Sequence, residues 1–333
     1  METLGNMNLQ LGEAVRIVMK TTPYIAYRAL IYGAICLATI AYLGVLGVIG
    51  LVFGAGAFWV LLIATMGLGW VLGVGRLLGA YVLYLLKAGH VALITEIATK
   101  GDLPTGISQT AWAKERVMDY FKEISVLAFI DQIVQAIIRV VNRRLVNVAS
   151  AIPIPGLEGA AKVANRIVDF SLKFIDESVI AHTFRTESDN VYDAARSGIL
   201  LYCQSWKALL YNAVALTVLS YVFAIAAAVV FMIPLGIIAW MIEAQAIRFA
   251  LFAIAVFMGI SLKWILFDPV ASTSTILTFL KETEGKEPDP EWEARIESVS
   301  NQFATLKQRA AEHWGAPPGA SPDDGEPVDE NLN

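Results

Sequence analysis

The stretch ALLYNAVALTVLSYVFAIAAAVVFMIPLGIIAWMI, residues 208–242, contains no aspartate, glutamate, lysine or arginine. A transmembrane helix needs about 20 consecutive apolar residues, because the hydrocarbon core of a bilayer is about 30 Å thick. A second uncharged run covers Ala29–Gly75, and a shorter one covers Phe249–Leu262. Hydrophobic residues make up 56% of the chain, which exceeds the share of about 45–50% in soluble domains. The sequence therefore predicts an all-α, polytopic integral membrane protein.

The apolar runs predict about six transmembrane or half-buried helices in a membrane domain that covers residues 29–284. These helices form three hairpins, over about 29–98, 124–184 and 209–267. Residues 56–98 alone would be about twice as long as a bilayer is thick. This segment is therefore either one kinked helix or two spans, and both six and seven spans remain open.

Basic residues gather in the polar segments on one side of the hairpins, whereas the turns near 53–58 and 232–240 contain none. Short loops rich in lysine and arginine stay on the cytoplasmic side of a membrane. We therefore expect a multi-pass protein of the plasma (inner) membrane, with its N- and C-termini in the cytoplasm.

One pattern recurs in the polar segments: the end of an apolar helix, a short polar turn, and an amphipathic segment that ends in aromatic or basic residues. It occurs at 90–124, 178–210 and 267–306. An internal duplication would explain the pattern, and so would the general character of helices at a membrane–water interface. The amphipathic segments predict cytoplasmic interfacial helices between the hairpins.

The two ends of the chain differ from the membrane domain in composition. Residues 1–28 predict an N-terminal interfacial amphipathic helix, and residues 285–314 predict a cytoplasmic amphipathic helix. Residues 315–333 are rich in proline, glycine and aspartate, and such a composition is typical of a disordered acidic tail.

A polar stripe runs through the otherwise apolar segment FIDQIVQAIIRVVNRR, residues 129–144. Its members recur at helical spacing and are Asp131, Gln135, Arg139 and Asn142. The returning segment KVANRIVDFSLKFIDE, residues 162–177, carries a charged stripe of its own. Ionisable groups within a membrane must be paired or must face water. The stripes therefore either join the two helices as a structural contact, or lie on the membrane surface, or line a hydrated path or site.

An antiparallel arrangement of these two segments about their connecting turn pairs opposite charges. It places Arg139 opposite Asp169. It also places Gln135 opposite Lys173, about one helical turn from Asp131. The candidate pathway or ion-pair residues are accordingly Asp131, Gln135, Arg139, Asp169 and Lys173.

Three ordered segments carry a family resemblance. They are ISVLAFIDQIVQAIIRVVNRRL (124–145), VDFSLKFIDESVIAHTFRTESDNVYDAARSGILL (168–201) and FDPVASTSTILTFLKETEGKEPDPEW (267–292). Through them, the chain from about 79 to 295 resembles the C-terminal membrane half of the choline transporter-like family, and uncharacterised bacterial polytopic membrane proteins share a similar layout. That family has more spans and a large extracellular loop, and this chain shows neither. The resemblance implies a polytopic plasma-membrane protein that transports a choline-like solute.

A quaternary amine inside a membrane requires aromatic faces, because lipid cannot solvate its charge. The candidate aromatic contacts are Trp59, Trp70, Tyr81 and Tyr84. Two further aromatic residues, Trp240 and Trp264, are predicted to mark opposite interfaces of the last hairpin.

The motifs of the common enzyme classes do not occur in this sequence. There is no phosphate-binding glycine loop, no Ser/His/Asp signature, and no His/Cys spacing typical of a metal site. The two cysteines, Cys36 and Cys203, are far apart, so no disulfide framework follows from them. We therefore expect no enzymatic activity, no cofactor, no metal site and no nucleic-acid partner.

Two functions remain in view at this point. The first is passive or gradient-driven transport of a small polar or cationic, choline-like solute, because the chain has no ATP-binding motif. The alternative is a non-transporting membrane scaffold that recruits a cytoplasmic partner through residues 291–314, where apolar residues recur at helical spacing. Such a helix would otherwise form a homo-oligomer or fold back onto its own chain. The expected partners are thus the lipid bilayer, a small cationic solute, and a second copy or a cytoplasmic protein.

Overall fold

The computed structural model describes residues 9–52, 85–103, 106–121, 124–144, 161–243 and 245–315. The described residues are helical apart from short turns, so the all-α prediction is confirmed for them.

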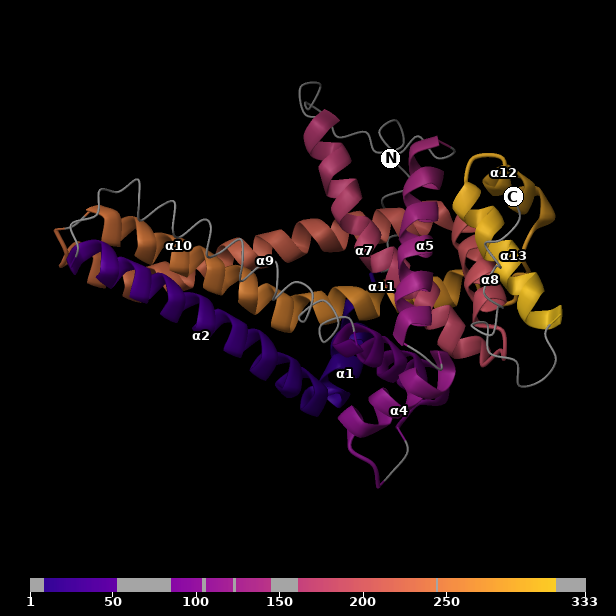
Figure 1. Cartoon of the computed structure of the whole chain (residues 1–333), viewed down its shortest axis with the longest axis horizontal. Helices are drawn as coiled ribbons and strands as arrows, with labels where there is room; N and C mark the ends of the chain where they lie inside the picture. Colours follow the sequence, from indigo (N-terminus) through magenta and orange to yellow (C-terminus); the bar gives the residue numbers. More distant parts are fainter. Residues whose placement is uncertain are drawn as a thin grey trace, which may run out of the picture.

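Three long apolar helices run side by side away from the rest of the molecule (Figure 1). They are α2 (Thr22–Val52), α9 (Trp206–Trp240) and α10 (Gln245–Leu262). We call α2, α10 and residues 218–240 of α9 the stalk. The apolar side chains of the stalk are widely exposed, as Val230 at 62% and Trp240 at 84% illustrate.

Three segments of the described chain are long and apolar enough to cross a membrane. These candidate spans are Thr22–Tyr42, Trp206–Trp240 and Ile247–Glu282. The last of them includes α10, the π-helical turn η2 (Lys263–Phe267) and α11 (Asp268–Glu282), which follow one another without a break. The expected hairpin over 209–267 is therefore present as α9 packed on α10.

The remaining helices form a compact body, which we call the head, at one end of the stalk. They are α1 (Leu11–Lys20), the helix over residues 85–100, α4 (Gln109–Phe121), α5 (Ile124–Arg144), α7 (Ala161–Thr186), α8 (Val191–Gln204), α11, α12 (Pro290–Glu297) and α13 (Asn301–Gly315). The start of α9 also enters the head, where Leu209 and Leu216 are buried. The core of the head contains large side chains that are almost fully inaccessible, among them Phe174, Tyr202 and Phe279.

The expected middle hairpin is formed by α5 and α7, which pack on each other within the head. α5 runs across the direction of α9 and α10 (Figure 1). Its apolar face, with Ile130, Val134 and Ile137, is buried in the core. Among the described residues, the candidate spans include neither α5 nor α7. Most of the expected hairpin over 29–98 lies outside the described residues, so the number of spans stays a prediction.

The recurring sequence pattern has a recurring conformation. The helices that end at residues 100, 186 and 282 are each followed, within three residues, by a residue with positive φ: Gly101 (91°), Glu187 (47°) and Gly285 (69°). Each following helix, α4, α8 or α12, begins at a side chain that accepts backbone N–H groups, namely that of Ser108, Asn190 or Asp289. Such caps satisfy donors that have no partner within the helix. The shared local structure agrees with a repeat, and its origin in a duplication stays a prediction.

The predicted terminal helices differ from the observed ones in their limits. Residues 11–20 form α1, and Thr21 separates α1 from α2. The single helix expected over 285–314 is divided at 298–300 into α12 and α13. Their apolar face is buried in the head at Ile296, Phe303 and Leu306. This is the face that the scaffold interpretation assigns to a partner. The predicted tail lies outside the described residues from 316 onward.

Candidate functional site

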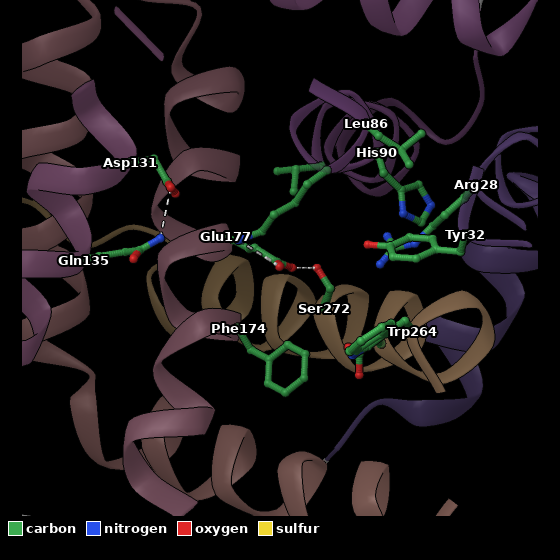
Figure 2. Close-up of a pocket in the computed structure, with 13 residues that line it drawn as sticks. Arg28, Tyr32, Leu86, His90, Asp131, Gln135, Phe174, Glu177, Trp264 and Ser272 are labelled. Atoms are coloured by element: carbon green, nitrogen blue, oxygen red, sulfur yellow. Dashed lines mark hydrogen bonds and ion pairs between the residues drawn. The ribbon is translucent and has the colours of Figure 1, made fainter. Parts of the chain in front are cut away.

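A cavity of about 490 Å³ lies where the stalk meets the head. Its walls come from α2, the helix over 85–100, α5, α7, η2 and α11. In Figure 2, Arg28, Tyr32 and His90 lie on one side of the cavity, and Asp131 and Gln135 lie on the other. The cavity therefore brings together segments that are far apart in the sequence.

Three carboxyl groups surround one lysine in the wall formed by the head. Lys87 Nζ lies 3.4 Å from Asp176 Oδ2 and 3.2 Å from Glu177 Oε1. Gln135 Nε2 donates hydrogen bonds to Asp131 Oδ2 at 2.9 Å and to Asp176 Oδ2 at 2.8 Å. One ammonium group thus faces three carboxyl groups, and the cluster carries a negative excess when all three are ionised.

Burial makes ionisation of these aspartates unfavourable. It raises the pKa of the Asp176 carboxyl to about 8, against the opposing effect of the Lys87 ammonium. Burial also raises the pKa of Asp131, and Lys87 again opposes it. For Lys87, burial lowers the pKa, but the carboxylates of Asp176 and Glu177 outweigh burial and keep the pKa above its ordinary value. The cluster therefore keeps a charged lysine, and its excess of negative charge favours the binding of protons or of a further cation.

Asp131 has an acceptor that the protein does not use. Its side chain is buried, with the residue 7% exposed, and its Oδ1 atom has no hydrogen-bond partner. Buried acceptors are normally satisfied, because desolvation without a partner costs about 1–3 kcal/mol. Since Asp131 lines the cavity, a donor or a cation in the cavity would satisfy this atom.

The wall that faces Asp131 across the cavity is lined by aromatic rings and by the guanidinium of Arg28. The Arg28 guanidinium lies over the Tyr32 ring, with Cζ 5.5 Å from the ring centroid. The Tyr32 ring in turn lies 5.9 Å from that of Trp264. His90 is held at the edge of this wall, because its Nε2 lies 3.1 Å from Thr21 Oγ1 and its ring stacks on Tyr24 at 5.4 Å.

A second charged pair, Lys263 and Asp268, lies beside the cavity, and Asp268 lines it. Lys263 Nζ lies 2.9 Å from Asp268 Oδ1, which also accepts a hydrogen bond from the Ser220 hydroxyl at 3.0 Å. The Lys263 ammonium additionally lies 5.1 Å from the centroid of the Tyr221 ring. On α11, Ser272 donates to Glu177 and thereby joins this end of the cavity to the lysine cluster. Both members of the buried pair are thus compensated, as buried charges generally are.

The structure brings together only part of the predicted set of polar residues. Asp131 and Gln135 line the cavity. Arg139 is exposed, and its Nε donates to the backbone oxygen of Gln135 at 3.1 Å. The side chains of Asp169 and Lys173 are not among those described, so both expected pairings stay predictions. The predicted aromatic contacts Trp59, Trp70, Tyr81 and Tyr84 lie outside the described residues.

Several residues that line or adjoin the cavity were not among the site residues predicted from the sequence. Asp176 and Glu177 are adjacent carboxylates at the end of the charged stripe on α7. This pair of neighbouring acidic residues could have identified them as site residues from the sequence. Arg28 stands one residue before the uncharged run that begins at Ala29, where a basic residue reads as an ordinary flank of a span. Ser272 has no distinguishing pattern around it.

The chain matches no family model, no curated protein and no solved structure with which it was compared. The resemblance to the choline transporter-like family therefore stays a prediction. Within the described residues, no group of three His, Cys, Asp or Glu side chains is placed to hold a metal ion. The chemistry of the site rests on its own geometry, which is that of a polar cavity with separated acidic and basic walls.

Proposed function

We propose that the protein is a plasma-membrane transporter that binds a small polar or cationic solute in the cavity at the base of the stalk. One observation carries the proposal: the buried carboxylate of Asp131 presents an unpartnered oxygen to this cavity. A cationic or hydrogen-bonding solute would supply the missing partner. No ATP-binding motif occurs in the chain, so movement of the solute would be passive or driven by a gradient.

The dimensions of the stalk support its placement in a bilayer. The exposed part of α9, residues 218–240, would be about 35 Å long, close to the thickness of about 30 Å of a hydrocarbon core. Tyr221 and Trp264 lie at the base of the stalk, and Trp240 lies at its tip. Tryptophan and tyrosine gather at the two membrane–water interfaces. This spacing supports a position of the cavity at one interface, next to the head.

The orientation of the head supports a role for α5 beside the membrane. With the stalk along the membrane normal, α5 would lie close to the membrane plane, because it runs across the stalk (Figure 1). Its Asp131 and Gln135 would then face the cavity at the membrane surface. A solute that arrives from the side of the head would meet these groups before it meets the apolar stalk.

Uptake into proteoliposomes tests the proposal. The purified full-length protein is reconstituted, a membrane potential is imposed, and uptake of labelled choline and labelled glycine betaine is followed against protein-free vesicles. We expect saturable uptake of at least one solute, lowered about tenfold or more by Asp131→Asn. The matched control is Asp119→Asn, because Asp119 is exposed on α4. Absence of uptake by folded protein, or equal uptake by both variants, would contradict the proposed site.

A further inference from the structure

We infer that the solute is a zwitterion, with its cationic group at Asp131 and its anionic group at Arg28. This inference rests on the proposed function, because it names the class of solute for the same cavity. It comes from two buried polar atoms without hydrogen-bond partners, Arg28 Nε and Asp131 Oδ1. Both residues line the cavity, and they lie on opposite sides of it (Figure 2).

Arg28 is a cation with a buried donor, Nε, that has no hydrogen-bond partner. Its guanidinium lies over the ring of Tyr32. The nearby carboxylates are engaged elsewhere, because Glu177 contacts Lys87 and Ser272, and Asp268 contacts Lys263. An arginine offers five N–H donors in a planar fork that matches a carboxylate. An anionic group on the solute would therefore fit this wall.

The other wall has the opposite requirement. Asp131, Asp176 and Glu177 share the single ammonium of Lys87, so this wall has an excess of negative charge when the three carboxyl groups are ionised. Phe174 also lines the cavity on this side, although its ring is almost fully buried. An ammonium or quaternary amine group would satisfy Asp131 without displacing Lys87.

A solute with both charges compensates both walls at once. A simple cation such as choline would leave the Arg28 guanidinium unpaired and would be repelled by it. A buried hydrogen bond to a charged group contributes about 1.5–3 kcal/mol, which corresponds to roughly ten- to hundredfold in affinity. We therefore expect a zwitterion to bind at least about tenfold more tightly than the corresponding cation.

Two matched pairs of solutes separate the contributions of the two walls. Glycine betaine differs from choline, and glycine from ethanolamine, only by a carboxylate in place of a hydroxymethyl group. Binding of all four is measured by calorimetry on the full-length protein in lipid nanodiscs. The variants are Arg28→Gln, Arg28→Lys and Asp131→Asn. The controls are Arg16→Gln and Asp119→Asn, because both residues are exposed on the head.

The expected result has three parts. At least one zwitterion binds more tightly than its matched cation. Arg28→Gln removes this preference by weakening the zwitterion alone, and Arg28→Lys, which keeps the charge but loses the fork, restores it only in part. Asp131→Asn weakens both members of the pair, and the controls weaken neither. Thermal unfolding of each variant shows that it is folded.

The opposite results are equally distinct. If neither zwitterion binds more tightly than its matched cation, or if Arg28→Gln weakens both members of the preferred pair equally, the zwitterion inference is overturned. Binding of the cation that still depends on Asp131 would then leave the proposed function standing. If none of the four solutes binds to the folded protein, the inference and the proposed site fail together.

Discussion

His182, on α7, is a buried histidine whose contacts define its protonation. Its Nδ1 lies 3.0 Å from Arg185 Nη2, and its Nε2 lies 3.0 Å from Ser197 Oγ. Arginine can only donate, so Nδ1 is the acceptor and the proton is on Nε2, which donates to Ser197. Burial, with a further contribution from Arg185, lowers the pKa of His182 from 6.5 to about 4. The folded protein therefore holds this ring neutral at pH values where an exposed ring is charged.

This histidine makes the protein less stable in acid. Between pH 6.5 and 4, the unfolded chain binds more protons at His182 than the folded chain, so the free energy of unfolding falls as the pH falls. The full effect is about 3 kcal/mol. We expect His182→Gln to lose this part of the pH dependence, as measured by unfolding in detergent from pH 8 to pH 4. Parallel curves for the two proteins would contradict the assignment.

Asp176 acts in the opposite direction and must be separated from His182. Its pKa is raised from 3.8 to about 8, so between these values the folded protein binds more protons than the unfolded chain. Its contribution to stability is therefore present at low pH and is lost as the pH rises toward 8. The comparison of His182→Gln with the wild type at each pH removes this second contribution, because both proteins contain Asp176.

At the scale of single helices, Asn190 joins two elements that are distant in the sequence. Its Oδ1 accepts from the backbone N–H groups of Tyr192 and Asp193, both at 3.1 Å, and so caps α8. Its Nδ2 donates to the backbone oxygen of Ala310 in α13 at 2.7 Å. One side chain thus satisfies the start of one helix and fixes the position of another.

Loss of this side chain should affect more than a cap. We expect Asn190→Ala to lower the free energy of unfolding by about 2 kcal/mol, about half from the cap and half from the hydrogen bond to α13. Asp289→Ala is the matched control, because Asp289 caps α12 through Glu291 N at 2.8 Å and should cost only about 1 kcal/mol. Both free energies of unfolding are measured by denaturant unfolding. Equal decreases in the two variants would show that the hydrogen bond to α13 contributes no stability.

The α9–α10 contact depends on small residues. A Cβ atom at Gly259 would lie 2.6 Å from Ala228 N and 2.7 Å from Ala224 O. The backbones of the two helices therefore touch, as in small-xxx-small packing of membrane helices. Ala255, one helical turn before Gly259, is fully buried. Alanine and glycine are common in membrane helices, so the sequence did not distinguish this contact.

We expect Gly259→Ala to destabilise the stalk. The new methyl group would meet backbone atoms that cannot move out of its way, and overpacking of this kind costs about 1–3 kcal/mol. Gly236→Ala in α9 is the matched control, because nothing lies within 4 Å of a Cβ at that position. Thermal unfolding in the same detergent compares the two. A Gly259→Ala variant as stable as the control would mean that the helices are not in contact there.

At the scale of the whole molecule, the division into stalk and head predicts which exposed surfaces face lipid and which face water. We expect Val230→Cys, on the stalk, to be protected from a water-soluble maleimide in nanodiscs. Glu312→Cys, on the exposed surface of α13, should react at least about tenfold faster. The thiolate is the reactive form of cysteine, and it forms readily in water but not in an apolar surrounding. Both variants are made in a protein that also carries Cys36→Ser and Cys203→Ser, so that the introduced cysteine is its single thiol. Similar rates at the two positions would place the stalk in water.

The sequence by itself determined the helical stalk. Whether a segment is apolar enough to cross a membrane depends on the composition of about 20 consecutive residues, and residues 208–242 meet this condition without any tertiary contact. The helix–turn–helix pattern at 90–124, 178–210 and 267–306 was likewise predictable, because caps and positive-φ turns involve only neighbouring residues.

Only the tertiary structure decided what covers each amphipathic face. Periodicity shows which side of α5 or α13 is apolar, but the same face would suit lipid, a partner or the head of its own chain. The cavity depends on such choices, because Arg28 and Ser272 meet there although most of the chain separates them. The positions of Asp131 and Gln135 in the wall followed from a local stripe. Their neighbours Lys87, Asp176 and Glu177 followed from how the helices pack, which no local pattern specifies.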